Sequence, residues 1–183
     1  MSFLVFHSLQ FAVYPAFMER RVKGHRRGTP LTYYFLTKDK DMGKRRRARE
    51  LAIQVLFHLE FNPGDQDDGF DLICEHFCPP NDIRSFSREL VRGIYGKKKE
   101  LDRLIRESSR HWRLERMSYV DRNILRLAIF EILYMEDIPP KVSIDEAVEL
   151  GKKYGTEESG AFINGILDHI YNYLLSRKEH ASR

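Results

Sequence analysis

The segment from Tyr119 to Asp168 constrains the fold more than any other part of the chain. Its apolar side chains recur at intervals of three and four residues, which is the period of an α-helix that buries one face. The segment is long enough for three short helices of this kind. We interpret it as a block in which helix packs on helix, and none of its residues forms a pattern typical of a catalytic site.

Capping residues and helix breakers divide this segment into its three helices. A capping box at 118–121 begins the first helix. The proline pair at 139–140 stops it, because proline lacks the amide proton and restricts the residue before it. A second capping box at 143–146 begins the next helix, and Gly155 closes it. Thr156 begins the third, where two following glutamates suit the positive end of the helix dipole.

The chain from Met42 to this segment also has helical periodicity. Its predicted helices cover residues 44–61, 70–77, 82–95 and 101 to about 112. Gly96 and the lysine run at 97–99 predict a break between the last two. Alternating strand patterns are absent from the sequence. We therefore expect an all-α fold of seven helices.

Several ordered motifs carry a resemblance to a known family. They are RRRARELAIQVLF at 45–57, DRNILRLAIFE at 121–131, DIP at 137–139, VSIDEAVEL at 142–150 and FINGILD at 162–168. With these motifs the chain resembles the NusB family of bacterial transcription antitermination factors, over roughly Met42 to Leu175. The resemblance implies a compact NusB-like fold made of two helical subdomains, one on each side of about Trp112.

Five basic residues gather at the start of the first predicted helix: Lys44, Arg45, Arg46, Arg47 and Arg49. Positive charge at a helix N-terminus opposes the helix dipole, which suggests that an external anion compensates it. Arginine suits phosphate oxygens because its planar group donates two parallel hydrogen bonds. The alternative is a solvated basic tail. The resemblance favours the first interpretation, since it implies that this segment contacts RNA.

Phe162 and Asn164 are the candidates for base recognition, because single-stranded RNA is read by aromatic rings and neighbouring polar groups. Phe162 shares a helical stripe with Ile166 and Ile170, so it could equally be a core residue. The lysines at 152–153 could extend a phosphate track or simply solvate the end of their helix. Base stacking by Phe162 therefore depends on the resemblance alone.

The resemblance also implies a protein-partner surface that includes Phe57, Asp121 and Arg122. Phe57 stands where the family commonly has tyrosine, so one possible hydrogen bond to a partner is absent. Ala161 stands where the family often has a basic residue, which would weaken RNA contact there. Gly165 costs a helix about 1 kcal/mol relative to alanine, so we expect it to permit a close helix crossing.

The first 41 residues differ from the rest of the chain. They hold seven Lys/Arg and three Asp/Glu, which accounts for the whole net charge of +4. Their apolar stretch at 3–17 is interrupted by polar residues and too short to cross a membrane, and it lacks the features of a secretory signal. We expect residues 1–41 to be an over-extended start before a natural Met42, or a disordered basic leader. The predicted domain covers residues 42–178, followed by a tail at 179–183.

Cys74, His76 and Cys78 have a spacing that could suggest a metal site. In a helix the two cysteines share a face and His76 points nearly opposite, so the three cannot converge on one ion. We expect no metal here, and two half-buried reduced thiols in a cytoplasmic protein.

Together these features predict RNA binding without catalysis or a cofactor. The resemblance implies recognition of boxA-type single-stranded RNA in nascent ribosomal RNA transcripts, together with the small-subunit ribosomal protein NusE. RNA polymerase and the other Nus factors would complete the assembly, which suppresses premature termination. Two alternatives remain: a domain that positions a ribosomal RNA methyltransferase, although no methyl-donor motif is present, and a helical adaptor that does not bind RNA.

Overall fold

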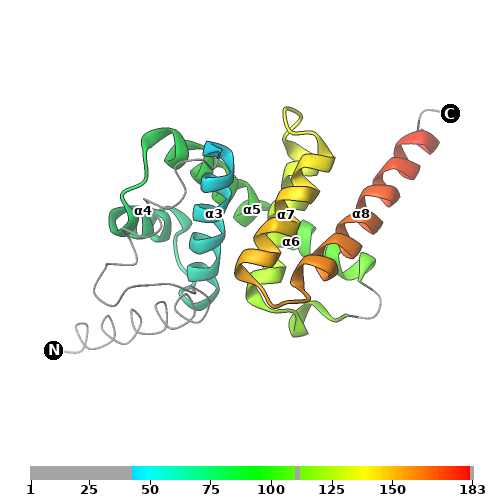
Figure 1. Ribbon diagram of the computed structural model, residues 1–183, viewed down its shortest axis with the longest axis horizontal. Helices are drawn as coiled ribbons and strands as arrows, with labels where there is room; N and C mark the ends of the chain where they lie inside the picture. The colour runs from blue at the N-terminus through cyan, green and yellow to red at the C-terminus, as the bar shows by residue number, and fades with distance from the viewer. Residues whose placement is uncertain (1–42, 110–111, 182–183) are drawn as a thin grey trace. The chain divides into compact units, whose positions relative to one another are not determined.

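The computed structural model of the chain describes residues 43–109 and 112–181, so the predictions for residues 1–41 and for a start at Met42 lie outside the described residues. The described part forms six α-helices and one short 3₁₀ helix, without strands (Figure 1). The elements are α3 (Lys44–Phe61), α4 (Gln66–Phe77), α5 (Asn81–Ser108), η1 (Leu114–Arg116), α6 (Tyr119–Tyr134), α7 (Pro140–Tyr154) and α8 (Ser159–Ala181). The predicted all-α class is confirmed. No helix in these ranges is long and apolar enough to span a membrane.

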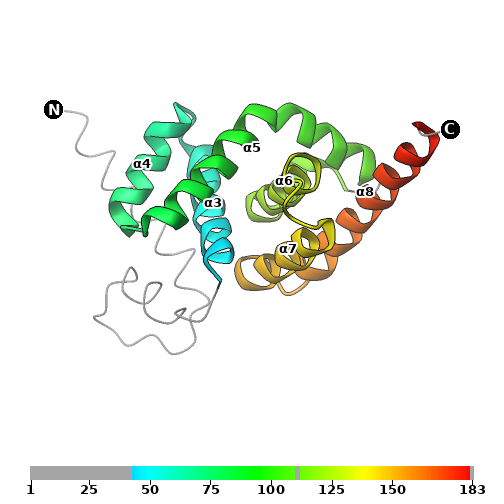
Figure 2. The same ribbon diagram turned by 90° about the horizontal axis from the view of Figure 1, so that it is seen from above.

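Helix α6 is the centre of the unit that begins at Gly43. It packs against α3 and α5, which precede Trp112, and against α7 and α8, which follow it. Figure 2 shows α6 lying between α5 and α7. Because neighbours surround it, almost every residue from Val120 to Glu131 is buried, not only one stripe. The helices on either side of Trp112 thus join into one compact unit around α6.

Helix α3 is buried more widely than its sequence indicated. The apolar residues that recur at helical spacing from Ala48 to Leu59 are buried, but so are Leu51 and Ile53 on other faces. The reason is that α3 packs on α5 and on α6 at the same time. Both ends of α3 nevertheless reach the surface, and these ends carry the candidate sites.

The predicted break at Gly96 is wrong, because α5 is one continuous helix of 28 residues. Leu90 and Ile94 before this glycine and Leu101 and Ile105 after it are all buried, so packing on both sides holds the helix through it. Gly93 has a clearer role than Gly96. A Cβ atom there would lie 2.1 Å from the Phe130 ring of α6, so only glycine permits this close approach. Two predicted helices are therefore one.

Three predicted helix starts differ from the structure. Helix α4 begins at Gln66 because Asp65 caps it, accepting hydrogen bonds from two backbone amides at 2.7 and 3.3 Å. Helix α7 begins at Pro140, since proline suits a first turn that needs no amide donor, and the predicted cap Ser143 is buried inside the helix. Helix α8 begins at Ser159, whose hydroxyl accepts from the amide of Thr156 at 2.7 Å. It runs to Ala181, past the predicted boundary at 178.

The two cysteines are free thiols in different surroundings. Cys74 is buried in α4, and burial raises the pKa of its thiol. Cys78 follows the end of the helix in a left-handed conformation and is exposed. The prediction of two half-buried thiols was therefore wrong for both positions.

Candidate nucleic-acid and partner interfaces

The five basic residues at the start of α3, here called the basic tract, are Lys44, Arg45, Arg46, Arg47 and Arg49. This end of α3 has Gly43 as its N-cap, without a side-chain cap or an acidic residue in the first turn. The compensating carboxylates come from α5, from α6, from α7 and from the segment between α6 and α7. The anion that the sequence suggested is thus supplied, for most of the tract, by the protein itself.

Lys44 and Arg45 lie on the surface and form solvent-exposed ion pairs. The Lys44 Nζ is 2.6 Å from Asp82 at the start of α5, and the Arg45 guanidinium is 2.6 Å from Asp137. Arg45 also lies over the Phe86 ring, 5.4 Å from its centroid. Exposed pairs of this kind contribute little to stability. Both cations can therefore exchange their carboxylate partner for a phosphate at small cost.

Arg46 is held more firmly. Its guanidinium donates two hydrogen bonds to Glu146 of α7, at 2.8 and 2.5 Å. The hydrogen bond from Arg46 lowers the pKa of Glu146 against the opposing effect of burial, and the same bond raises the pKa of Arg46. This bidentate pair connects the first turn of α3 to the middle of α7.

Arg49 is buried and paired inside the protein, so the structure gives it a role in packing, and its predicted contact with RNA stays a prediction. Its side chain is 3% exposed, and its Nε donates to the fully buried Glu131 of α6 at 2.7 Å. A second nitrogen lies 3.8 Å from Glu146. The periodicity explains this position: Arg49 follows Ala48 into the core, one turn beyond Lys44 and Arg45. Arg49 thus joins α3 to α6 and α7.

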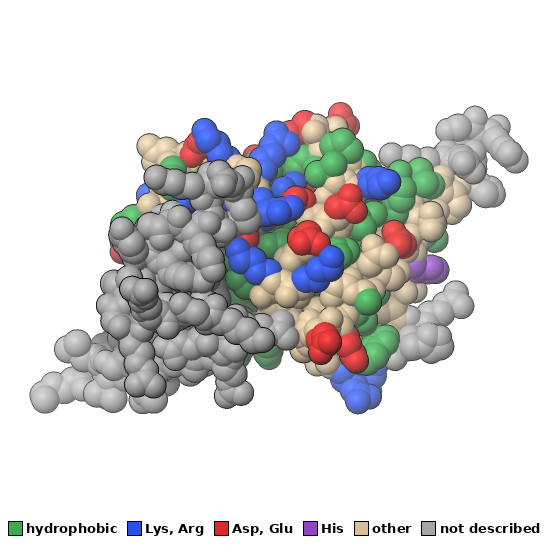
Figure 3. Space-filling view, in the orientation of Figure 1, with side chains coloured by type: hydrophobic (Ala, Val, Ile, Leu, Met, Phe, Trp, Pro, Cys, Tyr) green, Lys and Arg blue, Asp and Glu red, His purple; other side chains and the backbone are tan. Residues whose placement is uncertain are grey.

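Arg47 is half-buried and makes no ion pair or side-chain hydrogen bond in the described part of the chain. With Lys44 and Arg45 it forms the available portion of the basic tract. Farther along, Lys153 pairs with Glu50 of α3 and Lys152 with Glu149, each at 2.7 Å. Figure 3 shows basic and acidic side chains interleaved on the face over α3 and α7, where grey atoms do not cover it. Because acidic side chains interrupt the basic ones, this face is not a continuous positive surface, and an anion would bind at individual basic residues.

Phe162 is half-buried in the first turn of α8, and Asn164 is exposed two residues later, donating to Asp168 at 2.8 Å. The Phe162 ring meets the edge of Trp112, with 5.5 Å between ring centroids and 69° between their planes. Trp112 is exposed. The predicted close crossing at Gly165 is wrong, because this glycine is exposed and a Cβ atom there would meet nothing within 4 Å.

A chain of aromatic contacts, here called the aromatic patch, joins the end of α3 to the start of α6. Phe57 packs on Phe61 and Phe61 on Tyr119, with centroid separations of 5.1 and 4.9 Å. Arg122 lies over the Tyr119 ring at 4.7 Å. Phe61 and Tyr119 remain 54% and 42% exposed. The structure thus brings together two predicted partner residues, Phe57 and Arg122, and adds two more exposed rings.

Asp121 lies close by but does not reach the surface. Its carboxylate is 8% exposed and accepts a hydrogen bond from the Ser118 hydroxyl at 2.7 Å, while the Asp121 amide donates to the same hydroxyl at 3.0 Å. This is the predicted helix cap, which is confirmed. Asp121 thus takes part in the helix cap, and its predicted contact with a partner stays a prediction.

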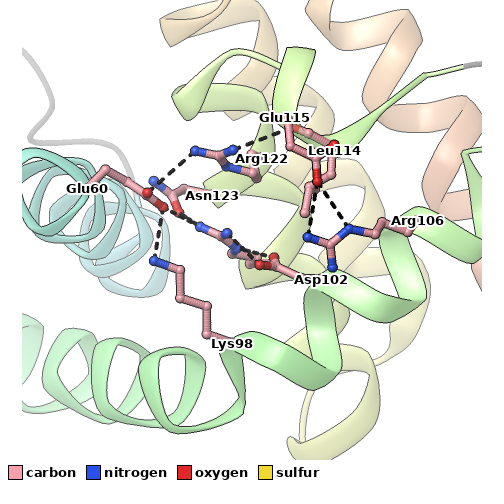
Figure 4. Close-up of polar contacts among 9 residues, drawn as sticks. Glu60, Lys98, Asp102, Arg106, Leu114, Glu115, Arg122 and Asn123 are labelled. Carbon is pink, nitrogen blue, oxygen red and sulfur yellow. Dashed lines mark hydrogen bonds and ion pairs between the residues drawn. The ribbon is translucent and has the colours of Figure 1, made fainter.

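Arg122 also belongs to a group of ion pairs centred on Glu60 (Figure 4), here called the Glu60 network. Arg126 of α6 donates to Glu60 of α3 and to both oxygens of Asp102 of α5, at 2.6 and 2.9 Å for the latter. Lys98 and Arg122 lie 3.5 and 3.4 Å from Glu60. Burial alone would raise the pKa of Glu60, but these cations outweigh it and lower the pKa. Three helices are tied together here.

Sequence reasoning missed Trp112, Phe61 and Tyr119. Each is an aromatic residue at the end of a predicted helix, close to a capping or turn signal, where packing is least certain. The Glu60 network was missed too. Its one sequence signal is Arg126, a charged residue in the middle of the apolar run of α6.

Comparison with known proteins gives consistent matches. Residues 46–172 match the NusB family. The transcription antitermination protein NusB of Desulfatibacillum aliphaticivorans is 50% identical over 133 residues, which cover 73% of this chain and 93% of that protein. The solved NusB of T. maritima superposes with a TM-score of 0.64 at 42% identity, covering 69% of this chain and 89% of the other. A NusB solved with NusE and double-stranded RNA has a TM-score of 0.66 at 29% identity, covering 71% and 97%.

Proposed function

The chain belongs to the NusB family of transcription antitermination factors, and on this premise we propose that it binds RNA and a protein partner without catalysing a reaction. The proposed RNA is a single-stranded boxA-type element in nascent ribosomal RNA transcripts. The proposed partner is the ribosomal protein and elongation factor NusE. Bound together, they would act on RNA polymerase with the other Nus factors to suppress premature termination. A NusB solved in complex with NusE and double-stranded RNA supports the RNA and NusE parts of this proposal.

The observation that carries the RNA part of the proposal is the available portion of the basic tract. Lys44, Arg45 and Arg47 stand at the surface of one helix end, held only by exposed ion pairs or by none. Each contact to a phosphate releases counterions, so binding should weaken as salt concentration rises. Contacts of this kind supply affinity but do not read the sequence.

The test replaces Lys44, Arg45 and Arg47 by alanine and measures RNA binding by anisotropy at several salt concentrations. Each lost phosphate contact should reduce the slope of log affinity against log salt by about 0.7 for a single strand, and affinity should fall for every RNA sequence tested. The matched control removes the same charge from exposed Lys99, Arg103 and Arg177. Two results would favour the alternative, a helical adaptor that does not bind RNA. One is an equal loss of RNA affinity in both variants, and the other is an unchanged salt slope in the first variant.

The aromatic patch is the proposed surface for the protein partner. Exposed aromatic rings beside an arginine have the composition of interface hot spots. Phe61→Ala should weaken binding of NusE by about tenfold or more, and calorimetry should show little change with salt because apolar burial dominates. Tyr173→Ala, which removes a similarly exposed ring from α8, is the control and should bind NusE as the native chain does. Equal affinity for the native chain and Phe61→Ala would refute this surface.

A further inference from the structure

Trp112 is the most exposed large apolar side chain in the described part of the protein, at 58%. The sequence places it outside the core pattern, and the proposed function above does not use it. An aromatic ring of this size on the surface is available for stacking against a planar ligand. The surroundings of Trp112 indicate which ligand that is.

The buried residue Ser109 forms hydrogen bonds with the backbone of Trp112. The Trp112 amide donates to the Ser109 carbonyl at 2.9 Å, and the Ser109 hydroxyl lies 3.0 Å from the Trp112 carbonyl oxygen. Ser109 itself is 7% exposed at the end of α5. The indole is further supported by the edge-to-face contact with Phe162. Trp112 is therefore exposed but held in place, which reduces the entropy lost when a ligand binds.

The first turns of α8 next to Phe162 carry small or polar side chains. Ala161, Asn164 and Gly165 are all exposed there. Glycine inside a helix costs about 1 kcal/mol relative to alanine, and packing does not explain Gly165, because a Cβ atom would meet open space. Glycine is also used where a ligand approaches the backbone closely. The exposed Trp112 contacts Phe162 in the first turn of α8, and this bare stretch of the helix lies within three residues of Phe162.

The charges beside Trp112 favour a nucleic acid over an apolar protein segment. Arg113 and Arg116 are exposed, and neither makes an ion pair within the described ranges. Aromatic rings with neighbouring cations are the combination that holds single-stranded nucleic acid, since bases stack on the rings and phosphates meet the cations. We propose that Trp112 is a base-stacking residue, which with Phe162 holds one unpaired base of a bound RNA strand. This inference rests on the proposed RNA-binding function.

The chain offers a direct probe, because Trp112 is its only tryptophan. Unlabelled boxA-like RNA is added to a mixture of the full chain and NusE, and it should quench the Trp112 fluorescence. The same RNA added to NusE alone gives the background signal. In parallel, anisotropy of a dye-labelled strand measures affinity. Trp112→Ala should bind about tenfold more weakly, and Trp112→Phe should retain most of the affinity. Tyr173→Ala is the control for loss of an exposed ring and should bind normally.

Two further arms identify the contact. Oligomers that each lack one base should include one position at which the native chain and Trp112→Ala bind equally, because the stacked base is then absent. Gly165→Leu should keep or raise the melting temperature, since leucine is the better helix former, but should weaken RNA binding by covering the bare stretch of α8.

The outcomes separate the two proposals. If the labelled strand binds but Trp112 emission is constant and Trp112→Ala binds equally well, the stacking role is overturned and the proposed function stands. A quench without any loss of affinity in Trp112→Ala overturns it too, because the ring is then merely near the RNA. If the labelled strand does not bind the native chain with NusE, both proposals fail.

Discussion

The two ends of α3 use the same chemical groups in opposite ways. At its start, the basic tract presents Lys44 and Arg45 to solvent, where carboxylates from other parts of the chain pair with them at the surface. At its end, the nearly buried Glu60 forms ion pairs with Lys98, Arg122 and Arg126. One end can exchange its partners for a ligand, whereas the other cannot without exposing a buried charge.

This difference shows that exposure, not residue type, decides what an ion pair does here. An exposed pair is weak because water and salt screen it. A buried pair is costly to break, since the remaining partner is left uncompensated. Arg49 shows the same difference within the basic tract. It is next to the exposed cations in the sequence, but its side chain is buried and pairs with Glu131.

The largest effect should come from the buried side of the comparison. Arg126→Ala leaves Glu60 and Asp102 without their main partner, so the free energy of unfolding should fall by about 3–5 kcal/mol. Urea denaturation followed by circular dichroism measures this loss. Arg103→Ala on the exposed face of α5 is the control and should be close to native. If Arg126→Ala lowered the free energy of unfolding no more than this control does, the buried pairs would not be more stabilising than the exposed ones.

Arg49→Ala tests the comparison where sequence and position disagree. We expect a loss of about 3 kcal/mol, because Glu131 is then a buried unpaired charge. Under conditions in which the variant stays folded, its RNA affinity should be native or nearly so. An Arg49→Ala protein that is fully stable but deficient in RNA binding would show that Arg49 belongs with its exposed neighbours.

Glu146→Gln tests the ion pair between Arg46 and Glu146, which is more buried than the surface pairs of Lys44 and Arg45 and less buried than the pair of Arg49. The pKa of Glu146 is lowered in the folded chain, so its pairing stabilises the fold above the unfolded value of about 4.3 and is lost as pH falls through the folded value. The variant should be less stable by about 1 kcal/mol near neutral pH. Unfolding curves from pH 7 to pH 3 should show this difference shrinking below about pH 4. A difference independent of pH would mean that the charge of Glu146 is not responsible.

The smallest effect should come from Lys44→Ala. Its pair with Asp82 is exposed on both sides, so the melting temperature should not change measurably. RNA affinity and its salt dependence should still fall slightly, because one cation has been removed. A clear drop in melting temperature would contradict the assignment of the surface pairs to ligand binding.

Most helices of the fold were predictable from apolar periodicity: the predicted range of α3 matches the structure, and α6 begins directly after its predicted cap, Ser118. The errors have physical causes. Gly96 indicated a break, but residues buried on both sides of it outweigh its low helix propensity. Residues 143–146 match a capping box, so the helix was predicted to begin at Ser143. It begins earlier, at Pro140, because Pro139 and Pro140 determine its first turn.

The candidate site was less predictable, because local sequence does not encode burial or distant partners. The position of the basic tract was clear, but the division between exposed Arg45 and buried Arg49 depends on the carboxylates of Asp137 and Glu131, more than 80 residues away. Trp112 and Phe61 lie outside regular apolar patterns, so nothing in the sequence marked them as surface rings. Contacts between distant segments decided both.

The continuity of α3 has a consequence for assembly. A helix rises about 1.5 Å per residue, so the 18 residues of α3 form one stiff rod about 27 Å long, with the basic tract at its start and the aromatic patch at its end. The rod is clamped along its length by α5 and α6 and contains no glycine or proline that could act as a hinge. It works as a fixed spacer: a strand and a protein docked at its two ends would be set at a distance that neither can adjust.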